Sequence, residues 1–120
     1  MELISTNICK TGDIGVNDNL FGGTMLAWLD VAGGIMASCA VKSNNVITLK
    51  MDEVLFKKPV KVKDLVRIYG EVTHIGKTSL SLNLEARRVN HVNKSEDLVC
   101  STSMIYVRID KDGNPKAIRE

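Results

Sequence analysis

Residues Asn19–Val41 read NLFGGTMLAWLDVAGGIMASCAV, and this stretch decides the fold because it is long, apolar and almost free of charge. Its one ionisable group is Asp30, and burying an unpaired carboxylate among apolar residues costs roughly several kcal/mol or more. The length and composition predict one long helix that is apolar on nearly every face. Such a helix must be covered on most sides, and the position of Asp30 needs a functional reason.

The same stretch raises the question of a membrane span, for which about 20 apolar residues suffice. Two glycine pairs weaken that interpretation, and an aspartate at the centre of a bilayer costs roughly 3 kcal/mol. Strand patterns follow the helix. We therefore expect a buried core helix and no association with a membrane.

Composition limits the class of protein. A chain of 120 residues with 44% hydrophobic content fits one domain, so we assign residues 1–120 to a single domain. The net charge of +2, mixed along the chain, gives no reason to expect a nucleic-acid partner. Cys9, Cys39 and Cys100 are odd in number and far apart, which argues against a disulfide framework or a zinc site. With no secretory pattern in MELISTNICK, a cytoplasmic location is expected.

The residues after the helix change to the period of a strand. Ile47, Leu49 and Met51 alternate with polar residues, which predicts a strand with these three side chains on its covered face. Asp52 and Glu53 break the alternation and predict a bulge, after which the strand continues to residue 56.

Further strands and turns follow from the same patterns. The predicted strands are residues 65–75, 78–88 and 98–109 and one strand before residue 13; the predicted turns and loops are residues 57–64, 76–77, 89–97 and 110–114. In the 78–88 strand, Leu80, Leu82, Leu84 and Ala86 share one face. We predict an α+β fold in which a strongly curved antiparallel sheet wraps around one central helix. Its free edges favour pairing with a second copy.

Three motifs have an ordinary structural explanation beside a functional one. GKTS at Gly76–Ser79 resembles the end of a P-loop, but Glu71 replaces the required glycine and a strand follows, so a nucleotide P-loop is rejected. It is either a hairpin turn or a turn whose amides, lysine and hydroxyls contact a phosphate. The lysines of residues 57–63 are either a solvated turn or an attraction for a phosphorylated ligand. DKDGN, residues 110–114, is a turn that lacks the later ligands of a calcium loop.

Histidine and nucleophile chemistry have weak support. His74 and His91 have no cysteine or carboxylate at a metal or triad spacing, so neither is a candidate catalytic residue. Ser38 and Cys39 lie in the helix without a base at a suggestive spacing. No metal site is predicted.

The start of the helix is the remaining candidate. Gly22 and Gly23 would leave backbone amides of the first turn free to polarise a carbonyl oxygen, although they could equally serve only a tight turn. Asp30 lies eight residues beyond Gly22, or about 12 Å along the helix at about 1.5 Å per residue. Both groups cannot contact one carbonyl carbon. If they serve one reaction, the helix start of one chain must meet the aspartate of another.

Three stretches of the sequence together resemble the signatures of hotdog-fold acyl-CoA thioesterases. They are NLFGGTMLAWLDVAGGIMA (residues 19–37), VITLKMDEVLFKKPVKVKDLV (46–66) and GEVTHIGKTSLSL (70–82), and the resemblance extends over roughly residues 12–114. The stretches are most similar to the YciA-type branch and the brain acyl-CoA hydrolase group. This resemblance implies a hotdog fold, acyl-CoA as the substrate, and dimers that assemble into a trimer of dimers.

The resemblance also implies roles for individual residues. It makes Asp30 the general base or nucleophile, Gly22 and Gly23 the oxyanion amides, and Asn19 a group that positions water or the thioester. The expected substrate-binding residues are Phe21, Lys58, Gly76, Lys77, Thr78 and Ser79. No separate cofactor is expected, because coenzyme A is part of the substrate. Two alternatives stay open: a non-catalytic acyl-CoA-binding module, and a hydratase, which would need a catalytic histidine.

Overall fold

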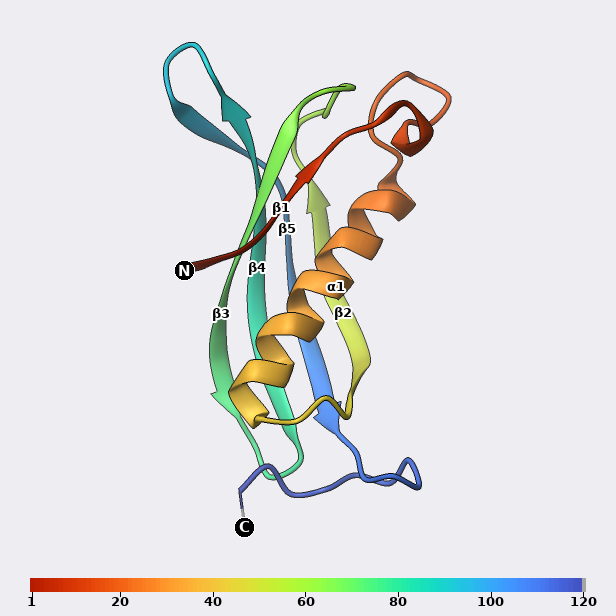
Figure 1. Ribbon diagram of the computed structural model, residues 1–120, viewed down its shortest axis with the longest axis vertical. Helices are drawn as coiled ribbons and strands as arrows, with labels where there is room; N and C mark the ends of the chain where they lie inside the picture. Colours follow the sequence, from red (N-terminus) through yellow and green to blue (C-terminus); the bar gives the residue numbers. More distant parts are fainter. Residues whose placement is uncertain (120) are drawn as a thin grey trace.

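The computed structural model describes residues 1–119 as a five-stranded antiparallel sheet with one long helix along one face (Figure 1). In chain order the elements are β1 (Glu2–Ile8), a 3-10 turn (Thr11–Asp13), α1 (Gly22–Val41), β2 (Val46–Phe56), β3 (Leu65–Ile75), β4 (Ser79–Asn90) and β5 (Ser95–Arg108). The strands lie in the order β1-β3-β4-β5-β2, so β1 and β2 are the two edges. The predicted α+β arrangement of one helix and a curved antiparallel sheet is confirmed.

Helix α1 begins and ends at identifiable backbone conformations. Phe21, just before it, is extended (φ −64°, ψ 134°), and Lys42, just after it, is left-handed, with its N–H donated to the Ser38 carbonyl. By length and apolar composition α1 could cross a membrane. In the structure it lies along the sheet instead, with one side buried: Met25, Leu29, Ala32, Gly33, Ala37 and Val41.

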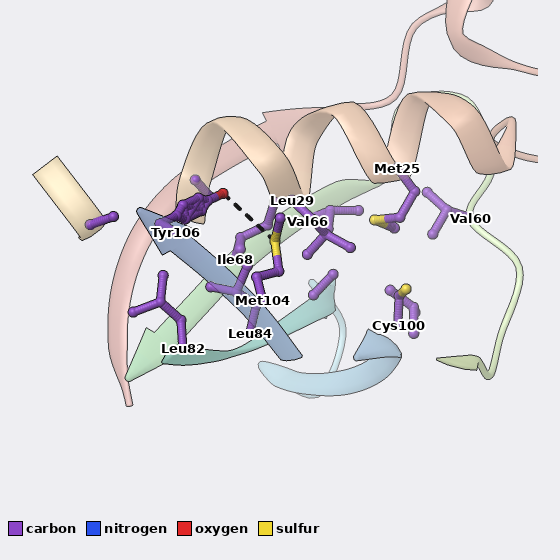
Figure 2. Packing of buried hydrophobic residues seen from close by; sticks show 14 of the residues in the cluster. Met25, Leu29, Val60, Val66, Ile68, Leu82, Leu84, Cys100, Met104 and Tyr106 are labelled. Carbon is purple, nitrogen blue, oxygen red and sulfur yellow. Dashed lines mark hydrogen bonds between the residues drawn. The ribbon is translucent and has the colours of Figure 1, made fainter. Parts of the chain in front are cut away.

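The core lies between α1 and the three central strands (Figure 2). The predicted alternation in β4 is confirmed, since its four alternating apolar residues, Leu80, Leu82, Leu84 and Ala86, are all buried. Val66 and Ile68 on β3 and Met104 on β5 complete the floor beneath the helix. Each fully buried side chain of this size contributes about 1.5–3 kcal/mol.

Strand β2 has the predicted boundaries but not the predicted facing. A bulge between Thr48 and Lys50 shifts the phase, so Met51 pairs with Met104 while Thr48 faces the helix. Ile47 and Leu49 are 48% and 59% exposed, so their assignment to the covered face is wrong. An extra residue in a strand resets the alternation without leaving a mark in composition. The one bulge that the sequence predicts, at Asp52 and Glu53, is confirmed, because the register shifts again between Asp52 and Leu55.

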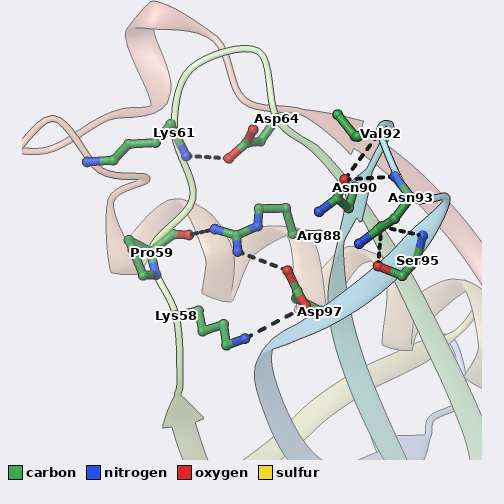
Figure 3. Close-up of polar contacts among 10 residues, drawn as sticks. All are labelled: Lys58, Pro59, Lys61, Asp64, Arg88, Asn90, Val92, Asn93, Ser95 and Asp97. Carbon is green, nitrogen blue, oxygen red and sulfur yellow. Dashed lines mark hydrogen bonds and ion pairs between the residues drawn. The ribbon is translucent and has the colours of Figure 1, made fainter.

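The β4–β5 connection is shorter than predicted. Residues 89–97 were expected as a loop, yet Val89 pairs with Glu96 and Asn90 with Ser95, so only residues 91–94 form the turn. The Asn90 side chain accepts hydrogen bonds from two backbone amides within this turn (Figure 3). This hairpin extends past the core and carries polar residues on both faces, so it shows no apolar alternation.

The sheet covers one side of α1 only. The sequence predicted a helix covered on most sides, but Val31 and Ile35 on its outer side are 64% and 46% exposed. Ile47 and Leu49 of the edge strand β2 are exposed as well. One chain therefore leaves apolar surface that soluble proteins usually cover.

Candidate active site

Asp30 is held by two hydroxyl groups of the sheet. Thr48 Oγ1 donates to Asp30 Oδ1 at 2.5 Å, and the Tyr106 hydroxyl lies 3.0 Å from the same oxygen. The Tyr106 hydroxyl also lies 2.8 Å from the Asp30 backbone oxygen. The residue is exposed at the helix surface rather than buried. The burial cost suggested by the sequence is therefore not incurred, because the carboxylate is both partnered and open to solvent.

Thr48 and Tyr106 were missed by sequence reasoning. They are direct cross-strand partners between β2 and β5, which places both hydroxyls under Asp30. Thr48 is 18 residues and Tyr106 is 76 residues from Asp30 in sequence. The only local signal was a polar Thr48 and a large Tyr106 inside strand patterns, which does not reveal the pairing register.

The start of α1 presents free backbone donors. The first backbone hydrogen bonds of the helix run from Thr24 and Met25 to the Phe21 carbonyl, and within residues 1–119 no backbone carbonyl accepts from Gly22 or Gly23. A side chain at Gly23 would collide with the Phe21 ring. Two amides at a helix N-terminus, where the dipole is positive, can bind a carbonyl oxygen that becomes negative.

A cavity of about 330 Å³ opens beside this helix start. Its floor is apolar, formed by Met25, Val60 and Val99, and its rim carries Asn19 and Lys58. The Asn19 side-chain oxygen accepts a hydrogen bond from Lys61 Nζ at 2.5 Å. Asn19 and Lys58 thus line one cavity beside the start of α1.

Lys58 belongs to a small ion-pair cluster (Figure 3). Its Nζ lies 3.7 Å from Asp97, and Arg88 contacts the same carboxylate at 3.1 Å while donating to the Pro59 carbonyl at 2.7 Å. The hydrogen bond from Arg88 and, next, the charge of Lys58 lower the pKa of Asp97. Lys58 is half exposed and so remains available to an incoming anion.

The Gly76–Ser79 hairpin lies at the opposite end of the molecule. Gly76 N–H donates to the Ser79 carbonyl at 2.7 Å, which confirms the turn. The carbonyls of Lys77 and Thr78 accept from Ile118 and Arg108. This turn lies near the C-terminal end of α1, whereas Gly22 is at the other end (Figure 1). A single chain therefore does not bring the hairpin and the helix start together.

The three cysteines of the described residues are free thiols, and Cys39 is the exposed one. Within residues 1–119, no three histidine, cysteine or acidic side chains are grouped as a metal site would need. Burial raises the pKa of Cys100 to about 11, so this thiol stays protonated at neutral pH. Cys9 is buried as well.

One long helix packed on a five-stranded curved antiparallel sheet is the arrangement of hotdog-fold thioesterases. Residues 17–94 match the Thioesterase superfamily, and the chain belongs to this superfamily. The chain is 28% identical over 120 residues to the acyl-CoA thioester hydrolase YciA of Salmonella typhimurium, covering 98% of this chain and 90% of that protein.

Two solved structures show the same fold. The hexameric thioesterase y2039 from Yersinia pestis is 27% identical with a TM-score of 0.91, covering 99% of this chain and 96% of that chain. An acyl-CoA hydrolase from Staphylococcus aureus, solved with butyryl coenzyme A and coenzyme A, is 26% identical with a TM-score of 0.88. That match covers 94% of this chain and 68% of the other. Variants of the Staphylococcus enzyme with an asparagine, an aspartate or a threonine replaced by alanine were also solved.

Proposed function

We propose that this protein hydrolyses acyl-CoA thioesters to a carboxylic acid and free coenzyme A, with Asp30 as the reacting carboxylate. The observation that carries the proposal is the contact of Thr48 and Tyr106 with one Asp30 oxygen on an otherwise apolar helix. The names of the similar proteins support the same reaction.

In the reaction, a water oxygen attacks the thioester carbon and its proton passes to Asp30. The tetrahedral intermediate then collapses and the carbon–sulfur bond breaks. The leaving sulfur takes that proton from Asp30 and departs as the thiol of coenzyme A. In the alternative route, Asp30 attacks the thioester carbon directly, the carbon–sulfur bond breaks, the coenzyme A thiolate leaves, and water hydrolyses the resulting anhydride. In either route, amides at Gly22 and Gly23 would stabilise the oxyanion, a contact that can contribute roughly 3 kcal/mol.

The site is proposed to be shared by two copies of the chain. Asp30 and Gly22 are about 12 Å apart along one helix, and a reacting carbonyl must lie close to both. The exposed apolar side of α1 and the free β2 edge are surfaces that a second copy would cover. Since the Yersinia relative is hexameric, we extend the proposal to dimers assembled as a trimer of dimers.

The spacing of the residues replaced in the Staphylococcus enzyme can be compared with the spacing of the polar residues proposed here. The threonine replaced there follows the replaced aspartate by 17 positions, and Thr48 follows Asp30 by 18. The replaced asparagine precedes that aspartate by 15 positions, where this chain has Gly15. At 17 positions after Asp30 this chain has Ile47, one residue before Thr48. The proposed role of Thr48 therefore rests on its contact with Asp30, and that of Asn19 in positioning water rests on its place at the cavity rim.

Coenzyme A would contact residues at both ends of the molecule. Phe21 and Lys58 lie beside the helix start of one chain, and residues 76–79 of the other chain would contribute amides, hydroxyls and a lysine to the phosphates. No cofactor beyond the substrate is proposed. The reaction is proposed to take place in the cytoplasm, without a membrane or nucleic-acid partner.

The test is release of free thiol from short, medium, long and aromatic acyl-CoAs by the wild-type protein and Asp30→Asn. General-base catalysis contributes about 10²–10⁴-fold, so Asp30→Asn should lower kcat by that factor. Size-exclusion chromatography and thermal unfolding should show an unchanged folded assembly. Hydrolysis by Asp30→Asn at the wild-type rate would contradict the assignment. Acyl-CoA binding without thiol release would favour the binding-module alternative, and hydration of enoyl-CoA would favour the hydratase.

A further inference from the structure

The Tyr106 hydroxyl is the buried end of the contacts around Asp30. Tyr106 projects from β5 beneath the helix and is 1% exposed (Figure 2). Burial first, and Asp30 next, raise the pKa of Tyr106. The phenol therefore stays protonated at neutral pH and remains a hydrogen-bond donor. Its single proton is shared between the Asp30 backbone oxygen at 2.8 Å and Oδ1 at 3.0 Å, so the hydroxyl holds both the helix turn and the side chain of this residue.

Gly33 leaves the space that Tyr106 occupies. A Cβ built at Gly33 would collide with the Tyr106 hydroxyl and lie 3.0 Å from its Cζ. A Cβ at the neighbouring Gly34 would meet nothing within 4 Å. Glycine inside a helix costs about 1 kcal/mol relative to alanine, so its presence at Gly33 has a local steric reason. The two adjacent glycines are a natural test and control.

The two oxygens of Asp30 have different surroundings. Thr48 Oγ1 and the Tyr106 hydroxyl both contact Oδ1, at 2.5 Å and 3.0 Å. In the part of the chain that the structure describes, no donor contacts Oδ2. A general base needs one oxygen within hydrogen-bond reach of the water it deprotonates. Oδ1 is thus the held oxygen, and Oδ2 is free to accept the proton.

We infer that Tyr106 is a positioning residue of the proposed hydrolysis: its hydroxyl, in the space left by Gly33, fixes Asp30 Oδ1 so that Oδ2 faces the attacking water. The inference rests on the proposed function, because it concerns the same carboxylate. Displacing a reacting group by about 1 Å can lower a rate by as much as 10²-fold. Tyr106 itself does not contact the substrate, since its side chain lies beneath the helix.

Tyr106→Phe keeps the ring and removes only the hydroxyl. We expect kcat to fall about tenfold with KM unchanged, because the phenol affects the orientation of Asp30 and not substrate binding. Gly33→Ala should give a similar loss by displacing the ring, whereas Gly34→Ala, on the outer side of α1, should leave Tyr106 and the Asp30 rotamer in their wild-type places. A Tyr106→Phe enzyme with kcat within about twofold of wild type would overturn the inference. An equally large change in KM would also overturn it, because the site as a whole would then have been disturbed.

A crystal structure of Tyr106→Phe separates this inference from the proposed function. We expect the Asp30 carboxylate to leave its wild-type rotamer in that variant, with the fold intact. A carboxylate in its original place would overturn the role of Tyr106 whatever the kinetics. If the wild-type protein releases no thiol from any acyl-CoA, the proposed function fails. In that case the Asp30 rotamer still decides whether Tyr106 positions it.

Discussion

The two sides of α1 differ in how far one chain completes them. The inner side is finished: Leu29 and Ala32 are fully buried, and Gly33 lies against the Tyr106 hydroxyl. The outer side is unfinished: Val31 and Ile35 are exposed, and the carboxylate of Asp30 opens to solvent. One chain orients the carboxylate from within, and no donor among residues 1–119 contacts its Oδ2. Folding of one chain thus completes the inner half of the proposed site, and in our proposal a second copy supplies the outer half.

The largest expected effect comes from removing an amide of the helix start. Proline is well accepted at the first position of a helix, and Phe21 before it is already extended, so Gly22→Pro should fold normally while losing one N–H. Loss of an oxyanion donor should lower kcat by about 10²–10³-fold. The control is Gly22→Ala, which keeps the N–H and adds a Cβ at ordinary contact distance, 3.5 Å, from Phe56. Equal rates for the two variants would show that this amide has no catalytic part.

Mixed assemblies test whether the amide and the carboxylate come from different chains. In a dimer of one Gly22→Pro chain and one Asp30→Asn chain, one site carries both defects and the other carries neither. Co-refolded mixtures should therefore regain activity that neither variant has alone, measured as thiol release after mixing is verified by mass spectrometry. Absence of recovery would place both groups in one chain and remove the distinction between the two sides of α1.

The completed inner side is the part that sequence predicts well. Leu80, Leu82 and Leu84 alternate cleanly because β4 is a central strand with one face on the helix. Asp30 stands out because it is the one charge in a long apolar run. Thr48 and Tyr106 could not be identified, because their meeting depends on the β2–β5 register and on a bulge that the composition of β2 does not reveal. Long-range pairing, not local propensity, builds this half of the site.

The next largest effect is expected from a variant on the outer side of α1, which one chain leaves exposed. Ile35 is 46% exposed there, and a lysine at this position should hinder a second copy without disturbing the core. We expect Ile35→Lys to remain folded, to dissociate in size-exclusion chromatography with light scattering, and to lose at least about tenfold in activity at low protein concentration. Val92→Lys is the control, since Val92 is 96% exposed at the tip of the β4–β5 hairpin. A fully assembled Ile35→Lys protein would mean that copies associate through another surface.

The smallest effect concerns the ion pairs beside the helix start. Arg88 and Lys58 lower the pKa of Asp97, so the charged form stabilises the folded state above its usual pKa of 3.8, and this contribution is lost as the pH falls through the lowered value. In urea unfolding, the midpoint of Asp97→Asn should therefore lie slightly below that of the wild type at pH 7. The two midpoints should be equal at strongly acidic pH. Glu71→Gln is the control, because Glu71 is exposed on β3 and has no ion-pair partner among residues 1–119. If Asp97→Asn changes the midpoint equally at both pH values, the carboxylate stabilises the fold through its shape and hydrogen bonds and not through its charge.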